Sequence, residues 1–159
     1  MRWREAALFG LALLAAGCSS PAPETSGSKP EGKTLRVAVI PKGTTHEFWK
    51  SVEAGAEEAG KELGVEVIWK GPLKEDDRDS QIKTVEDFIT NKVDGIVLAP
   101  LDDTALVAPV EEAMNAGIPV VIFDSGLKKE GTVSFVATDN FKGGEMAGDE
   151  LAKLLGGKG

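Results

Sequence analysis

Two apolar runs in the sequence are each followed directly by side chains that can hydrogen-bond to a ligand or stack on it. These side chains are Lys42, His46, Phe48, Trp49 and Asp124. Charged groups make hydrogen bonds roughly twice as strong as neutral ones, and aromatic rings supply rigid apolar contact area. The set is suited to holding a small polar ligand between charged and aromatic groups.

Residue patterns that would support catalysis are missing from the sequence. It has no Gly-x-Gly-x-x-Gly after the first apolar run and no Gly-x-x-x-x-Gly-Lys-Ser/Thr loop for phosphates. Its single histidine and the lack of a Gly-x-Ser-x-Gly elbow give no hydrolase triad. One cysteine and one histidine cannot build a zinc site of the usual type. We therefore expect no enzyme, no catalytic residue, no cofactor and no metal.

The elements that would position these side chains alternate between strands and helices. Strands are expected at 35–40, 65–69, 93–100, 118–123 and 132–137. Helical spacing predicts a first helix capped by Thr44 with Glu47 in a capping box, a second around 82–89 and a fourth over 141–155. Asp102 or Asp103 could cap the third helix, with Pro109 in its first turn. This alternation predicts an α/β fold with a doubly wound parallel sheet.

The N-terminal segment has the features of an export signal. A short basic start precedes an apolar run over 6–16, and small residues precede Cys18. The segment 14–18 resembles the bacterial lipobox, although Ala15 stands where leucine is preferred; the alternative is an ordinary signal peptide with an incidental cysteine. Residues 1–17 are expected to be the signal peptide. Residues 18–33, rich in Pro, Gly and Ser, are expected to be the lipidated cysteine and a flexible linker.

Composition narrows the classes of partner. The chain of 159 residues is 42% apolar and 28% charged, which is typical of a globular protein, and its formal charge is −8. Domains that bind nucleic acid usually show a basic face. We expect no nucleic-acid partner, and contact with a membrane only through the lipid anchor.

Four segments in a fixed order resemble the type I periplasmic sugar-binding proteins, the substrate-binding components of ABC importers of the ribose, rhamnose and autoinducer-2 kind. The segments are Val37–Trp49, Val93–Pro100, Gly117–Asp124 and Ala137–Gly144. The resemblance implies two α/β lobes that close on a sugar, an ABC permease as partner, a monomer, and a location in the periplasm or at the cell-envelope surface. It implies that 34–137 is an incomplete N-terminal lobe. Residues 138–159 would be the interlobe crossing and the start of a second lobe, which is truncated; a compact natural half-protein is the alternative.

The same resemblance assigns roles to the candidate residues. It implies that Asp124 contacts ligand hydroxyls and that Lys42 faces ligand oxygens, while His46 stands where ribose-type members place a sugar-binding asparagine. Phe48 and Trp49 match paired aromatic positions, one of which must pack inward. The other readings are a helix cap or lobe-packing contact for Asp124, a solvated turn for Lys42 and a surface position for His46.

Two further observations bear on specificity and on function. Ribose-type members follow the aspartate with an arginine, whereas this sequence has Ser125 and Gly126, so ribose specificity does not follow. A receptor lobe that reports ligand to a chemotaxis or sensor-kinase partner is the alternative function. A repressor core fits poorly, because repressors of this fold begin with a DNA-binding helix pair.

The acidic run at 75–77 is expected to be a solvated loop.

Overall fold

The computed structural model describes residues 32–157. The chain divides into two units, Met1–Gly32 and Lys33–Gly159, and all described secondary structure lies in the second. The expected signal peptide, the lipidated Cys18 and nearly all of the expected linker lie outside the described residues. Within residues 32–157 no helix combines the length and the apolar character needed to cross a membrane.

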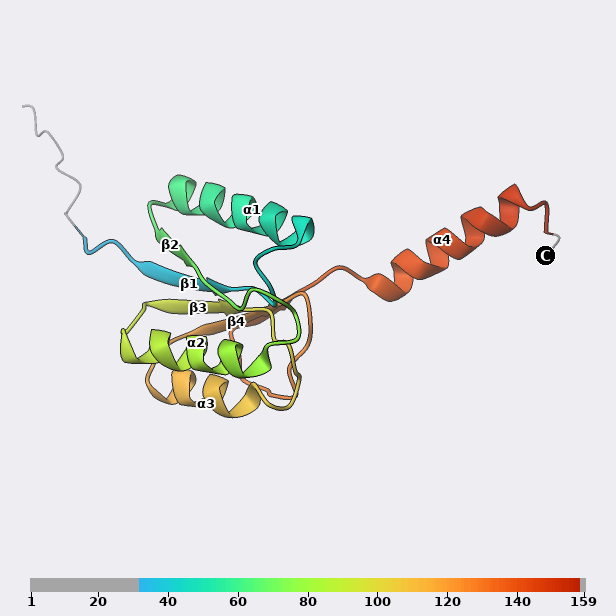
Figure 1. Ribbon diagram of the computed structural model, residues 1–159. Coiled ribbons are helices and arrows are strands. Elements are labelled where there is room, and N and C mark those ends of the chain that lie inside the picture. Colours follow the sequence, from blue (N-terminus) through green and yellow to red (C-terminus); the bar gives the residue numbers. More distant parts are fainter. Residues whose placement is uncertain (1–31, 158–159) are drawn as a thin grey trace, which may run out of the picture. The chain divides into compact units, whose positions relative to one another are not determined.

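The second unit is built on a sheet of five parallel strands in the order β2-β1-β3-β4-β5 (Figure 1). The strands are β1 (Arg36–Ile40), β2 (Glu66–Trp69), β3 (Gly95–Leu98), β4 (Val120–Phe123) and β5 (Ser134–Val136). The helices are α1 (Glu47–Leu63), α2 (Arg78–Thr90), α3 (Val107–Asn115) and α4 (Asn140–Leu154). Helix α1 covers one face of the sheet, and α2 with α3 covers the other (Figure 1). The doubly wound parallel sheet predicted from the sequence is confirmed.

The hydrophobic core lies between the sheet and the α2–α3 layer. Side chains such as Ile40, Leu98, Val85 and Val110 are completely buried there. The face under α1 is thinner, and an apolar hollow of about 450 Å³ remains between that helix and the strands. The Leu63 side chain of α1 borders this hollow but stays 76% exposed.

The predicted cap of α1 is wrong. Thr44 does not cap the helix; its hydroxyl donates to the carbonyl of Pro72 at 3.3 Å. His46 is the N-cap instead, and its Nδ1 accepts from the backbone N–H of Phe48 at 3.2 Å. The helix therefore begins at Glu47, two residues later than the capping box would place its first turn, because the threonine hydroxyl is used in a long-range contact.

The cap predicted for α3 is also wrong. The N-cap residue is Leu106, which makes no side-chain cap bond. Asp102 instead accepts from the backbone N–H groups of Thr104 and Ala105 in the turn before the helix. Those two bonds hold the pKa of the Asp102 carboxyl below its usual value. Pro109 does lie in the first turn of the helix, as predicted, where its missing N–H costs nothing.

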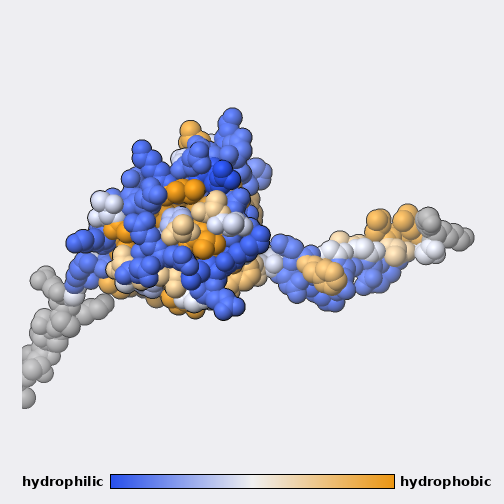
Figure 2. All heavy atoms as spheres, turned by 90° about the horizontal axis from the view of Figure 1, so that it is seen from below, coloured by the Kyte–Doolittle hydropathy of each residue, from blue (hydrophilic) through white to orange (hydrophobic). Residues whose placement is uncertain are grey.

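Helix α4 differs from the other helices in burying none of its residues. Asp139 caps it by accepting from the backbone N–H of Lys142 at 2.9 Å. Figure 2 shows hydrophobic residues at the surface of this helix, and Phe141, Met146 and Leu154 are each more than half exposed. The helix matches the predicted one in position, but among the described residues no element covers its apolar side chains.

One buried amide joins the strand ends on the α2 side of the sheet. Gln81 on α2 is fully buried. Its amide nitrogen donates to the carbonyls of Pro41 at 3.0 Å and Ala99 at 2.8 Å, and its oxygen accepts from the N–H of Leu101 at 2.8 Å. All three partners lie just beyond the ends of β1 and β3. Gln81 therefore fixes the two loops relative to each other.

Substitution of Gln81 by alanine should lower the free energy of unfolding by roughly 3 kcal/mol, because the change leaves two buried carbonyls and one half-buried N–H without this partner. Gln81→Glu should be as harmful, since a carboxylate would face two carbonyl oxygens. Urea denaturation measures both. The matched control is Lys83→Ala on the exposed side of α2, which should stay within about 0.5 kcal/mol of wild type. A loss for Gln81→Ala as small as the control's would refute the role assigned to the amide.

A carboxylate that directly precedes β3, at the amino-terminal ends of the strands, predicts that the stability depends on pH. Asp94 pairs with Lys33 at 2.6 Å and accepts from the backbone N–H of Arg36 at 2.9 Å, and both bonds lower its pKa from the ordinary 3.8. A lowered pKa in the folded state stabilises the fold above the unfolded-state value and loses this effect as the pH falls through the folded-state value. Asp94→Asn should therefore lower the thermal midpoint at about pH 7 and have less effect near pH 3. The control is Glu86→Gln, an exposed carboxylate; a deficit for Asp94→Asn that is equal at both pH values would contradict the prediction.

Candidate functional site

Lys42 and Asp124 meet at the carboxyl edge of the sheet. Lys42 follows β1 and Asp124 follows β4, and β3 lies between these strands. The Lys42 ammonium pairs with the Asp124 carboxylate at 2.8 Å and also donates to the hydroxyl of Ser125. The side chains of Lys42 and Asp124 are 19% and 29% exposed, so the pair is partly shielded from water but still reachable by a ligand.

The backbone at Asp124 is in the left-handed region, with φ +62°. Such a conformation costs a residue with a Cβ of order 1–3 kcal/mol and occurs most often at functional sites. The Asp124 N–H donates to the carbonyl of Val136 at 2.9 Å, and the Ser125 N–H donates to the carbonyl of Phe123 at 2.7 Å. No described helix is capped by Asp124, so the helix-cap reading of this residue is not realised.

The Lys42 ammonium borders an open pocket of about 610 Å³. The pocket is lined mainly by the loops after β3 and β4, through Pro100, Leu101, Asp102, Asp103, Ser125, Gly126, Leu127 and Lys128. Its charges are balanced locally, because Asp103 pairs with Lys128 at 3.1 Å. Hydrogen bonds from Thr104 and Lys128 lower the pKa of the Asp103 carboxyl. The pocket wall is therefore polar and almost neutral.

The two aromatic residues at the start of α1 have different environments. Trp49 is 2% exposed, whereas Phe48 is 51% exposed. Their rings meet edge to face with centroids 4.9 Å apart, and Trp49 meets Phe123 in the same manner at 6.1 Å. One of the pair packs inward, as the sequence predicted. Phe48 offers a free ring surface, and Trp49 supports it from below.

His46 serves first as a structural residue. Its Nδ1 is occupied by the cap bond to Phe48, while the residue as a whole is exposed. The ring is therefore held at the beginning of α1, beside Phe48. The structure brings Lys42 and Asp124 together directly. Phe48 is connected to this pair through the rings of Trp49 and Phe123. His46 is connected to it only by its position at the start of α1.

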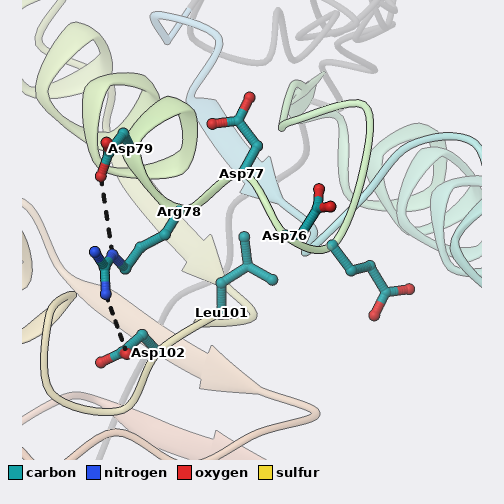
Figure 3. Close-up of a pocket in the computed structure, with 7 residues that line it drawn as sticks. Asp76, Asp77, Arg78, Asp79, Leu101 and Asp102 are labelled. Carbon is teal, nitrogen blue, oxygen red and sulfur yellow. Dashed lines mark ion pairs between the residues drawn. The ribbon is translucent and has the colours of Figure 1, made fainter.

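A second pocket, of about 410 Å³, lies between the loops after β2 and β3. Arg78 projects between Asp79 and Asp102 there (Figure 3), with ion pairs of 3.8 and 3.7 Å. The pocket is strongly acidic, with one arginine among its lining residues. Within residues 32–157 no cluster of three or more His, Cys, Asp and Glu side chains has the arrangement of a metal site.

The fold has relatives among known proteins. A family model described as periplasmic binding protein domain matches residues 37–159. The chain belongs to the periplasmic binding protein family.

Several members of this family with sugar-related names are similar to the chain. It is 37% identical over 153 residues to a D-ribose/D-allose-binding protein of Pseudomonas aeruginosa, covering 91% of this chain and 48% of that protein. It is 34% identical to a ribose import binding protein of Bacillus subtilis, with coverage of 84% and 42%. The chain thus spans somewhat less than half the length of these relatives.

A solved structure supports the same assignment. A carbohydrate transporter solute-binding protein of Agrobacterium radiobacter, in complex with D-arabinose, superposes with a TM-score of 0.71 at 38% identity, covering 77% of this chain and 41% of that one. The predicted resemblance to type I periplasmic sugar-binding proteins is confirmed, and so is the fold class.

Around the candidate site of this chain, the structure adds three residues that the sequence analysis did not single out as site residues. Gln81 lies among apolar residues on the inner face of α2. A polar residue at such a position indicates a buried hydrogen-bonding role, and this pattern could have identified it. Ser125 was noted only as a departure from the ribose-type pattern. Glu75 lies in an exposed loop, as predicted, and its carboxylate also accepts a hydrogen bond from the buried Trp49 at 2.7 Å. No local pattern predicts this bond, because Trp49 lies 26 residues earlier in the chain.

The strain at Asp124 predicts an unusual order of stabilities. The free energy of unfolding of Asp124→Gly should be about 1 kcal/mol higher than that of Asp124→Ala. Both variants lose the carboxylate, but only alanine is sterically strained in the left-handed backbone conformation. Urea denaturation of both variants measures the difference. At Asp103, whose backbone is not left-handed, alanine should be at least as stable as glycine. Equal stability of the two Asp124 variants would show that no strain is stored there.

Proposed function

We propose that the chain is the N-terminal lobe of an extracytoplasmic solute-binding lipoprotein, and that it binds a sugar or sugar-like ligand for an ABC importer. The Lys42–Asp124 pair on a strained strand end carries the proposal, because it presents a fixed donor and a fixed acceptor at the edge where ligands bind open α/β sheets. The sugar-binding relatives and the structure with D-arabinose support the ligand class. The relatives are binding proteins, which supports a role without bond chemistry.

The remaining parts of the proposal concern the whole protein. Residues 1–17 would direct export, and Cys18 would carry the lipid that holds the protein at the cell envelope. Residues 34–137 would form one wall of the sugar cleft, and 138–159 would lead to a second lobe that closes over the ligand by a hinge. An ABC permease would receive the sugar from the closed monomer.

The roles at the site follow from its chemistry. Asp124 would accept from two ligand hydroxyls, and Lys42 would donate to a ligand oxygen. The exposed ring of Phe48 would face the C–H side of the sugar, with Trp49 behind it. The ring of His46 would reach the ligand from the start of α1.

Titration of the ¹⁵N-labelled chain with D-ribose and D-allose tests the proposal. Binding should be weak, because the resemblance places part of the contacts on a second lobe, so the titration must extend into the millimolar range. The amide signals of residues 42, 48 and 124 should shift and saturate with one of the sugars. L-leucine should leave them unchanged.

The matched variants for this titration are two lysines in ion pairs of similar length. Lys42→Met should abolish the saturating shifts. Lys129→Met removes a 28% exposed lysine that pairs with Glu111 at 2.9 Å, away from the site, and should preserve them. A response to L-leucine but to neither sugar would overturn the sugar assignment, as would sugar-dependent shifts that survive Lys42→Met.

A further inference from the structure

We propose that Glu75 is a positioning residue for the ligand site, holding Trp49 and through it the aromatic wall formed by Phe48 and Trp49. This inference rests on the proposed function for its consequence in sugar binding. Glu75 lies in the loop after β2, and nothing in the sequence pattern assigns it a role. Its carboxylate reaches across to α1 and accepts the indole N–H of Trp49 at 2.7 Å.

The hydrogen bond is short and has a charged acceptor, which makes it one of the stronger kinds available to an indole. It also removes a cost, since a buried N–H without a partner is unfavourable. Trp69 shows that this chain does not satisfy every indole: its Nε1 is buried and has no partner among the described residues. Trp49, in contrast, has its indole N–H paired with a carboxylate.

The path of the Glu75 side chain is cleared by Gly43. A Cβ added at Gly43 would lie 3.1 Å from Cγ of Glu75 and 3.4 Å from its backbone nitrogen. The loop after β1 therefore leaves room for the glutamate to pass. Two hydroxyls join the same pair of loops, because Thr44 donates to the carbonyl of Pro72 at 3.3 Å and Thr45 to that of Leu73 at 3.0 Å.

The indole that Glu75 holds connects the two halves of the site. On one side its ring contacts the exposed Phe48, and on the other it contacts Phe123. Phe123 is the last residue of β4 and directly precedes Asp124. A rotation of the indole would therefore change the support of Phe48 and the packing beneath the strand end that carries the carboxylate. Glu75 acts through Trp49 and is not itself placed against the ligand.

The test compares Glu75→Ala with Glu75→Gln in the whole chain. The glutamine keeps an oxygen that can accept the indole N–H, and alanine does not. The control is Asp76→Ala, which removes the next carboxylate in the same exposed loop. Two readouts are the ¹⁵N–¹H signal of the Trp49 indole and the dissociation constant for D-ribose or D-allose from the titration above.

Glu75→Ala should shift the indole signal and the ring signals of Phe48, and should weaken sugar binding by about fivefold, the factor that corresponds to one net hydrogen bond. Glu75→Gln and Asp76→Ala should stay near wild type in both readouts. In a Trp49→Phe background, which has no indole N–H, Glu75→Ala should cause no further loss of affinity.

The outcomes separate the inference from the proposed function. An unchanged indole signal in Glu75→Ala overturns the inference, as does a changed signal with unchanged sugar affinity, which would mean that the bond only stabilises the fold. If wild type binds neither sugar, the proposed function fails. The positioning role then stands if Glu75→Ala moves the signals of Phe48 and Asp124 while Glu75→Gln does not, and falls otherwise.

Discussion

The arrangement of the site depends on the buried amide of Gln81. Parallel strands bring their carboxyl ends to one edge of the sheet, but the loops that follow are free to move unless something joins them. Gln81 joins the chain at Pro41 to the chain at Ala99 and Leu101. Lys42 follows Pro41 directly, so its backbone origin is fixed by this clamp. The amide does so without a charge, and all its bonds are satisfied, which avoids the cost of a buried ion.

The charges at the site favour an uncharged ligand. Lys42 and Asp124 already neutralise each other, so an anion would compete with the carboxylate and a cation with the ammonium. A hydroxyl both donates and accepts, and can bond to either member of the pair without displacing the other. The nearby Asp103–Lys128 pair extends the same balance along the pocket. A neutral polyhydroxylated ligand is the kind that this distribution of donors and acceptors fits.

Local patterns predicted the fold well and the contacts between distant loops poorly. Apolar runs located all five strands, and topology alone brought Lys42 and Asp124 to one edge. The capping box failed because Thr44 gains a partner 28 residues away, which no short-range rule includes. The hydrogen bond from Trp49 to Glu75 was missed for the same reason, since the two residues lie 26 positions apart in the chain. Both contacts are tertiary, so they could be found only from the folded structure.

The backbone of Asp124 indicates that this position is shaped by more than folding. Lys92 is the other left-handed residue with a side chain in the described part of the chain, and it follows the end of α2, where such a conformation is common. Asp124 follows a strand, so no helix end explains it. The strain is offset by the ion pair to Lys42 and by the backbone bond to Val136. A glycine would adopt this backbone at no steric cost. The presence of an aspartate there is best explained by a need for its carboxylate.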